Sequence, residues 1–90
     1  MSELDDLHKT RKFAPLSGKM WKTLKCLDDY TKKHEYPPLY SEMCLLLGLA
    51  SKNTVFYRIN KLEDLGLIER RPGSPRSVIL TDRGRSVLHE

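Results

Sequence analysis

The chain has 90 residues, of which 39% are hydrophobic and 31% are charged, and its formal net charge is +4. A chain of this length supports one small domain and excludes two separate hydrophobic cores. It contains no run of ~18 apolar residues, so we expect no membrane-spanning helix, and its positive charge is compatible with a polyanionic partner such as nucleic acid.

The cysteines and histidines argue against a disulfide and against a metal site. Cys26 and Cys44 follow a polar N-terminus without a secretory signal, so we expect reduced thiols in a cytoplasmic protein. The two cysteines and the scattered histidines lack the spacing of zinc ligands. No acid pair or nucleophile–base pair indicates catalysis. We therefore predict no metal, no cofactor and no enzymatic activity.

Residues 1–16 alternate charges without an apolar period, and we expect a flexible arm there. Ser17 has the character of a helix N-cap, and an amphipathic helix is expected after it. This helix ends before Pro37 and Pro38, because proline cannot continue a helix and restricts the residue before it.

Two further helices are expected, one from about Tyr40 to Leu47 and one from Lys52 to about Leu65. Gly48 is suited to close the first of them and Ser51 to cap the second. Two helices joined by a glycine-containing turn are typical of a helix-turn-helix. The apolar positions that recur at helical spacing form the predicted core: Met20, Leu24, Leu27, Met43, Leu47, Val55, Ile59, Leu62 and Leu65.

The C-terminal third contains two β-prone runs, "LIERR" and "SVIL", separated by the turn-rich "PGSPR". They predict a β-hairpin with a basic tip. Thr81 is suited to cap a final short helix, which Gly84 weakens because glycine is a poor helix former.

The predicted fold is thus mainly α with a small β-hairpin: a winged helix-turn-helix with a three-helix core, a wing and a short C-terminal helix. The domain is expected to span residues 17–81, with residues 82–90 as a short C-terminal helix or tail.

The segment "YPPLYSEMCLLLGLASKNTVFYRINKLEDLGLIER" resembles the DNA-binding domain of the LexA repressor family without gaps. The matching features are the Pro-Pro entry, Glu42, the turn at Leu47-Gly48, the start at Ser51 and Asn53, and the "L…GLIE" pattern from Leu62 to Glu69. The tail "ILTDRGR" is also similar to the end of the wing in MarR-type proteins. The resemblance implies a sequence-specific regulator of bacterial or phage type that binds double-stranded DNA, a repressor in this family.

In LexA-like domains the second helix of the motif enters the major groove, which assigns helix 52–65 that role here. The positions that the resemblance implies for DNA contact are Ser51, Lys52, Asn53, Thr54, Phe56, Tyr57, Arg58, Arg70, Arg71 and Arg76. Asn53 has the donor and acceptor that the major-groove edge of adenine requires, and the aromatic rings suit thymine methyl groups. Ser51 and Lys52 lie where a helix N-terminus favours phosphate. The three arginines suit backbone phosphates or a minor groove.

Plainer interpretations stay open beside these. Ser51 could serve only as a cap, Asn53 could be an ordinary solvated residue, and the wing arginines could form a solvated hairpin edge. Arg58 has an alternative partner in one of three aspartates, Asp28, Asp29 or Asp64.

Two departures from the family pattern concern the short helix. Leu39 stands where the family usually has a hydroxyl residue that caps it, so another group must cap the helix, or the helix begins later with Ser41 as its cap. Leu45 and Leu46 replace polar residues, and an apolar surface of this kind is usually covered. The cover could be the arm through Phe13, a second subunit or a different protein.

An alternative function follows from these apolar residues. The chain could be a winged-helix protein-interaction module that binds a partner through Leu45, Leu46, Phe56 and Tyr57. If it binds DNA, we expect a homodimer on a two-fold operator, because one half-site is a small target. The aromatic pair also means that the family's operator sequence cannot be assumed. Full-length LexA continues into a self-cleaving protease domain, for which these 90 residues leave no room; the chain is a fragment or a stand-alone module.

Overall fold

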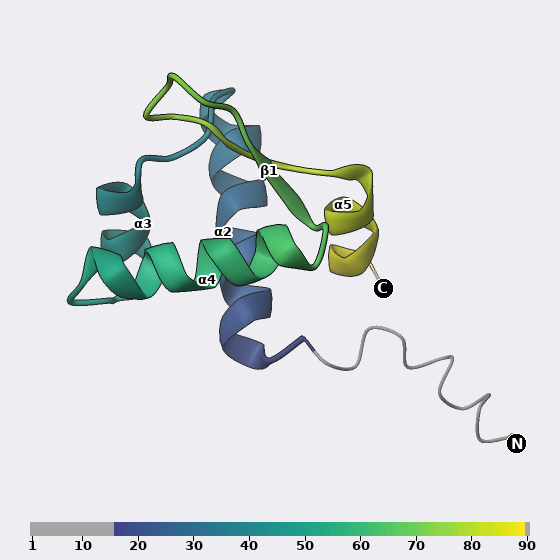
Figure 1. Cartoon of the computed structure of the whole chain (residues 1–90), viewed down its shortest axis with the longest axis horizontal. Coiled ribbons are helices and arrows are strands. Elements are labelled where there is room, and N and C mark those ends of the chain that lie inside the picture. Colours follow the sequence, from purple (N-terminus) through teal and green to yellow (C-terminus); the bar gives the residue numbers. More distant parts are fainter. Residues whose placement is uncertain (1–15, 90) are drawn as a thin grey trace, which may run out of the picture.

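The structure, a computed structural model, describes residues 16–89. The elements follow in the order α2 (Gly18–His34), α3 (Tyr40–Leu47), α4 (Lys52–Asp64), β1 (Ile68–Arg70), β2 (Val78–Leu80) and α5 (Asp82–Leu88). Helix α4 crosses α2, α3 lies beside the first turns of α4, the hairpin extends past the end of α2, and α5 packs on the opposite side from α3 (Figure 1). The predicted winged helix-turn-helix is confirmed. The predicted arm and Phe13 lie outside the described residues.

The helix ends carry the caps that the sequence indicates. The Ser17 hydroxyl accepts a hydrogen bond from the Met20 N–H at 3.2 Å, and that of Ser51 accepts one from the Asn53 N–H at 3.1 Å. Gly48 closes α3 with a φ of 68°, a left-handed conformation that glycine adopts without steric cost. Gly48 and Ser51 together fix the turn between α3 and α4.

At the start of α3, Glu42 supplies the reciprocal half of a capping box, and the Leu39 side chain makes no capping hydrogen bond. The side chain of Leu39 cannot accept a hydrogen bond, and the Glu42 carboxylate accepts one from the Leu39 N–H at 2.7 Å. The helix therefore begins at Tyr40, and the alternative of a later start capped by Ser41 is wrong.

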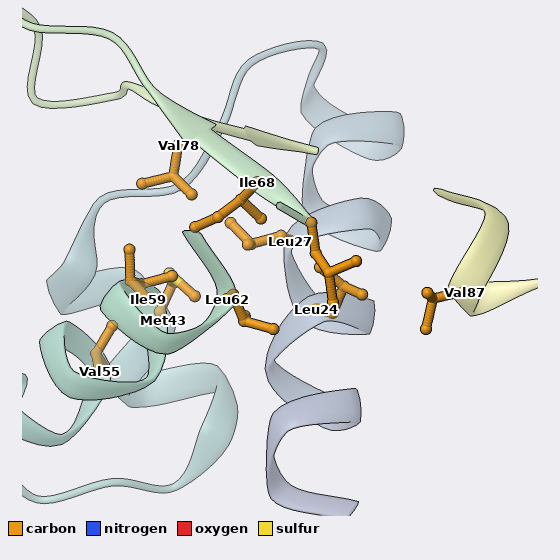
Figure 2. Close-up of a cluster of buried hydrophobic side chains, with 10 residues drawn as sticks. Leu24, Leu27, Met43, Val55, Ile59, Leu62, Ile68, Val78 and Val87 are labelled. Atoms are coloured by element: carbon orange, nitrogen blue, oxygen red, sulfur yellow. The ribbon is translucent and has the colours of Figure 1, made fainter. Parts of the chain in front are cut away.

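The core joins all three longer helices to the hairpin and α5 (Figure 2). Its buried apolar residues are Leu24, Leu27, Met43, Val55, Ile59, Leu62, Leu67, Ile68, Val78 and Val87. Met20 and Leu47 of the predicted core are half-buried and pack against it. Leu65 differs: it is 47% exposed, because it follows the last residue of α4 and turns outward.

The hairpin is antiparallel, with Ile68 opposite Leu80 and Arg70 opposite Val78. Gly84 in α5 lies against the backbone just before β1: a Cβ added there would stand 2.1 Å from the Leu67 carbonyl oxygen. The glycine that weakens α5 as an isolated helix is thus required for its packing. This contact holds α5 against the base of the wing.

Candidate nucleic-acid interface

Helix α4 has one face buried in the core. Val55, Ile59 and Leu62 are fully buried and recur at intervals of four and three residues. Because an α-helix turns about 100° per residue, the positions two residues before each of them point nearly the opposite way. These positions are Asn53, Tyr57 and Asn60.

We call Asn53, Tyr57 and Asn60 the outer stripe of α4. Tyr57 is 60% exposed, Asn53 is exposed and Asn60 is half-buried. Asn60 was not among the residues that the sequence analysis assigned to DNA. Its spacing of seven residues from Asn53, two helical turns, is the signal that could have found it.

Phe56 faces sideways from the outer stripe, toward α3 and the wing. Its ring lies 6.1 Å from that of Tyr40, centroid to centroid, and the Arg70 guanidinium carbon stands 5.6 Å from its centroid. Phe56 is still 48% exposed. Phe56 and Tyr57 therefore do not share one face: Tyr57 projects from the helix, and Phe56 flanks it.

At the start of α4, Ser51, Lys52 and Thr54 lie beside the outer stripe. The Ser51 hydroxyl accepts the capping hydrogen bond from the Asn53 N–H, and the residue itself is exposed at the surface. Lys52 is exposed and has no ion pair within residues 16–89. Thr54 is half-buried. Lys52 also lines an open cleft of about 460 Å³ between α3 and the wing loop, together with four hydroxyl residues, Tyr40, Ser41, Ser74 and Ser77.

Arg58 turns toward α2. Its Nη1 donates a hydrogen bond to the Thr23 hydroxyl at 3.3 Å. In the part of the chain that the structure describes, it forms no ion pair with any of the three candidate aspartates. It is half-buried between the two helices.

Arg76, in the loop of the wing, is bound to the helix-turn-helix. Its Nη1 and Nη2 donate to the two carboxylate oxygens of Glu42, both at 2.9 Å, and Nη1 also donates to the Pro37 carbonyl at 3.0 Å. Its guanidinium carbon lies 4.5 Å from the ring centroid of Tyr36. We call this set of contacts the Arg76 clasp; it ties the wing loop to the start of α3.

The clasp shifts the acidity of the groups within it. The hydrogen bonds from Arg76 lower the pKa of Glu42 from 4.5 to about 2, and the N–H of Leu39 and the hydroxyl of Tyr30 contribute in the same direction. The carboxylate in turn raises the pKa of Arg76. Both charges are therefore stabilised by each other at neutral pH.

Arg70, on β1, reaches across to α4. Its Nη2 donates to the Asn60 Oδ1 at 2.6 Å and its Nε to the Glu63 carboxylate at 3.2 Å. Its Nη1 lies 3.5 Å from the Tyr40 hydroxyl. The hydrogen bond to Glu63 raises the pKa of Arg70. Arg70 thus links the wing to both α3 and α4.

Arg71 differs from the other two wing arginines. It is exposed, and within residues 16–89 its side chain forms neither an ion pair nor a hydrogen bond. Its backbone N–H donates to the Ser77 carbonyl at 3.1 Å, which extends the hairpin toward the loop. The sequence predicts one role for all three wing arginines, because the carboxylates that bind Arg70 and Arg76 belong to other elements and, for Arg76, lie far away along the chain.

The described residues contain neither a cluster of metal-ligating side chains nor a helix suited to span a membrane. No group of three His, Cys, Asp or Glu side chains between positions 16 and 89 is placed to hold a metal ion. No helix in the same range has the length and apolar character needed to cross a bilayer. Cys26 and Cys44 are both half-buried and unpaired, and burial raises the pKa of the Cys26 thiol, as does nearby Asp29.

Comparison with known proteins identifies relatives of this fold and sequence. The chain is 37% identical over 67 residues to the LexA repressor of Ligilactobacillus salivarius (strain UCC118), covering 74% of this chain and 32% of that protein. It is 38% identical over 66 residues to the LexA repressor of Alkaliphilus oremlandii (strain OhILAs), covering 73% of this chain and 32% of that one. The chain therefore spans about a third of the length of these relatives.

A solved structure supports the fold. The crystal structure of RV1404 from Mycobacterium tuberculosis matches with a TM-score of 0.68 and 24% identity, over 88% of this chain and 52% of that one. Residues 13–77 match the LexA DNA binding domain family. The chain belongs to the family of LexA DNA-binding domains.

Proposed function

We propose that this chain is a sequence-specific binder of double-stranded DNA and the operator-binding part of a transcriptional repressor. The outer stripe of α4 carries this proposal, because it places polar and aromatic side chains opposite the core, where they contribute nothing to it. A recognition helix needs such a face, since bases are read by side chains that reach into the major groove. The names of the LexA repressors that the chain resembles support the same function.

The proposal gives the residues of α4 separate roles. Asn53 donates to and accepts from an adenine edge, and Tyr57 contacts a thymine methyl group or, through its hydroxyl, a phosphate. Thr54 and Phe56 contact methyl groups on either side of the stripe. A phosphate lies near the N–H groups that begin α4.

Lys52 and Ser51 supply the polar side chains around that phosphate. Both are exposed at the first turn of α4. The cleft beside Lys52 carries several hydroxyl groups and is open to solvent, which suits a phosphate of a DNA strand that lies against this surface.

On the wing, Arg71 is the residue that we propose for contact with phosphates or a minor groove. Arg70 and Arg76 are proposed to position the wing for DNA: each holds it against the helices through an ion pair with a carboxylate. Arg58 is proposed to fix α4 on α2 and to approach a phosphate with its remaining donors.

We further propose that the chain acts in the cytoplasm as a homodimer on a two-fold operator. Leu45 is 84% exposed and Leu46 is 59% exposed, which leaves an apolar surface on α3 for a second copy. Sedimentation of the chain with and without a two-site duplex tests the dimer. A single species with one chain per duplex would contradict it.

Selection of bound sites from a pool of random duplexes tests the proposed function. Recovery of a consensus with two related half-sites is the expected result. A pool without any consensus, together with retention of another protein that is lost in a Leu45→Asp variant, would support the protein-interaction alternative in its place.

A further inference from the structure

We propose that Asn60 is a second base-reading residue and that Arg70 fixes its side-chain amide so that only the N–H donors face DNA. Asn60 would then select a keto base, guanine or thymine, at one position of each half-site. This inference rests on the proposed function and extends it to the specificity of the same helix.

The position of Asn60 on α4 is the first support. It belongs to the outer stripe with Asn53 and Tyr57 and points away from the core residue Leu62. Seven residues separate Asn60 from Asn53, so the two side chains project about 10 Å apart along the helix at 1.5 Å per residue. With bases spaced ~3.4 Å along a strand, this corresponds to about three base pairs.

The contact with Arg70 sets the orientation of the amide. The Arg70 Nη2 lies 2.6 Å from the Asn60 Oδ1. A guanidinium has donors and no acceptor, so the amide oxygen, and not the nitrogen, must face it. The Nδ2 group then points elsewhere, and it has no acceptor within residues 16–89. Asn60 therefore directs its two N–H donors toward the groove, while its oxygen is turned toward Arg70.

Arg70 is itself held from several sides, which makes this orientation persistent. Glu63 accepts hydrogen bonds from its Nε at 3.2 Å and its Nη2 at 2.5 Å, and the Tyr40 hydroxyl lies 3.5 Å from Nη1. The ring of Phe56 flanks the guanidinium at 5.6 Å. A flip of the Asn60 amide would place its N–H donors against these bound N–H groups and is disfavoured.

Base chemistry converts this orientation into a preference. In the major groove, guanine presents O6 and N7 and thymine presents O4, all acceptors, whereas cytosine presents an N4 donor. Adenine presents one acceptor and one donor, so a donor-only amide satisfies half of its edge. Asn53 differs, since its amide has no side-chain partner in the described part of the chain and can turn to match both groups of adenine.

The test is selection from random duplexes with the wild type and with Asn60→Asp and Arg70→Lys variants. The wild type is expected to prefer guanine or thymine about three base pairs from the adenine read by Asn53. Asn60→Asp keeps the size and the contact to Arg70 but presents an acceptor, so that position should change to cytosine or adenine by roughly fivefold or more, the range of one base contact. Arg70→Lys loses the fork that orients the amide, and adenine should become tolerated there.

Glu69→Gln is the matched control, because Glu69 is exposed on the same strand as Arg70 and forms no ion pair within residues 16–89. Its consensus should equal that of the wild type. If Asn60→Asp or Asn60→Ala, each shown to be folded by thermal unfolding, weakens every sequence alike without a change at one position, Asn60 contacts a phosphate and the inference is overturned. A wild-type pool with no consensus would instead overturn the proposed function, and this inference with it.

Discussion

Arg70 and Arg76 on the wing and Asn53 and Tyr57 on the outer stripe of α4 are all polar, yet they use their side chains in opposite ways. On the wing, Arg76 binds Glu42 through two hydrogen bonds of 2.9 Å, and Arg70 binds Glu63 and Asn60. On α4, the side chains of Asn53 and Tyr57 form no hydrogen bond within residues 16–89. The polar groups of Arg70 and Arg76 hold the wing to the helices, whereas those of Asn53 and Tyr57 are available to a partner.

The number of arginines on this wing is therefore a poor measure of how many are free to contact DNA. An arginine whose donors are satisfied by a carboxylate must break those hydrogen bonds before it can bind a phosphate, and the carboxylate left behind opposes the exchange. Substitutions in the two regions should therefore have different effects. Those in and beneath the wing should lower the free energy of unfolding, and those on the outer stripe should weaken DNA binding.

The largest loss of stability is expected for Gly84→Ala in α5, where the helix packs against the backbone just before β1. The added Cβ would stand 2.1 Å from the Leu67 carbonyl oxygen, a backbone atom that cannot move without shifting β1. We expect a loss of about 1–3 kcal/mol in the free energy of unfolding, measured by guanidinium chloride titration. Gly18→Ala is the control, because a Cβ at Gly18 meets nothing within 4 Å. Equal stability of the two variants would contradict the packing described for α5.

Asn53→Ala is the corresponding change on the outer stripe. Loss of its contact should cost ~1–3 kcal/mol of binding to the selected duplex, measured by fluorescence anisotropy. Its free energy of unfolding should stay within about 0.5 kcal/mol of the wild type, since the side chain is exposed. If the variant unfolds more easily but binds the duplex as tightly as the wild type, Asn53 serves the stability of the fold and not DNA binding.

Glu42→Gln tests the Arg76 clasp through the pH dependence of the free energy of unfolding. The folded pKa of Glu42 is about 2, below its ordinary 4.5. A depressed pKa contributes stability that is present above pH 4.5 and is lost as the pH falls toward 2. Glutamine can still accept the hydrogen bond from Leu39, so the variant removes mainly the charge.

The difference in unfolding free energy between wild type and Glu42→Gln should therefore be largest above pH 4.5 and should shrink as the pH approaches 2. Urea titrations at several pH values measure it. A difference that is constant over this range would show that the charge of Glu42 contributes nothing, and Glu69→Gln supplies the control for an exposed carboxylate.

The smallest effect is expected for Arg71→Ala. Removal of one phosphate contact should weaken binding to all duplexes and reduce the slope of log K against log salt by about 1. Arg76→Ala should lower the stability of the fold, and it should change the slope of log K against log salt less than Arg71→Ala does. If Arg76→Ala reduced the slope as much as Arg71→Ala without affecting folding, Arg76 would be a DNA contact after all.

Much of this architecture was predictable from local sequence. Ser17, Gly48 and Ser51 mark helix ends because caps involve residues within a turn of one another, and Val55, Ile59 and Leu62 mark the buried face through their spacing. The fold class follows from these signals together with the resemblance, which also underlies the proposed role of α4 as a recognition helix.

The partners of the wing arginines were not predictable in the same way. Arg76 binds a carboxylate 34 residues earlier in the chain, and no local pattern specifies such a pairing. The sideways position of Phe56 depends on Tyr40 and Arg70, which come from two other elements. The need for Gly84 arises from its contact with Leu67, which only the assembled fold creates.

The side-chain amides of the outer stripe give the sharpest test of whether α4 contacts DNA. Asn53 and Asn60 are the only asparagines in the 90 residues, and the sequence contains no glutamine, so both side-chain amide signals in a nitrogen-correlated NMR spectrum report on the outer stripe. On titration with the selected duplex, both signals should shift in a saturable manner, whereas a shuffled duplex at the same salt concentration should shift them far less. If the amide signals stay in place while the methyl signals of Leu45 and Leu46 move, the outer stripe of α4 does not contact DNA.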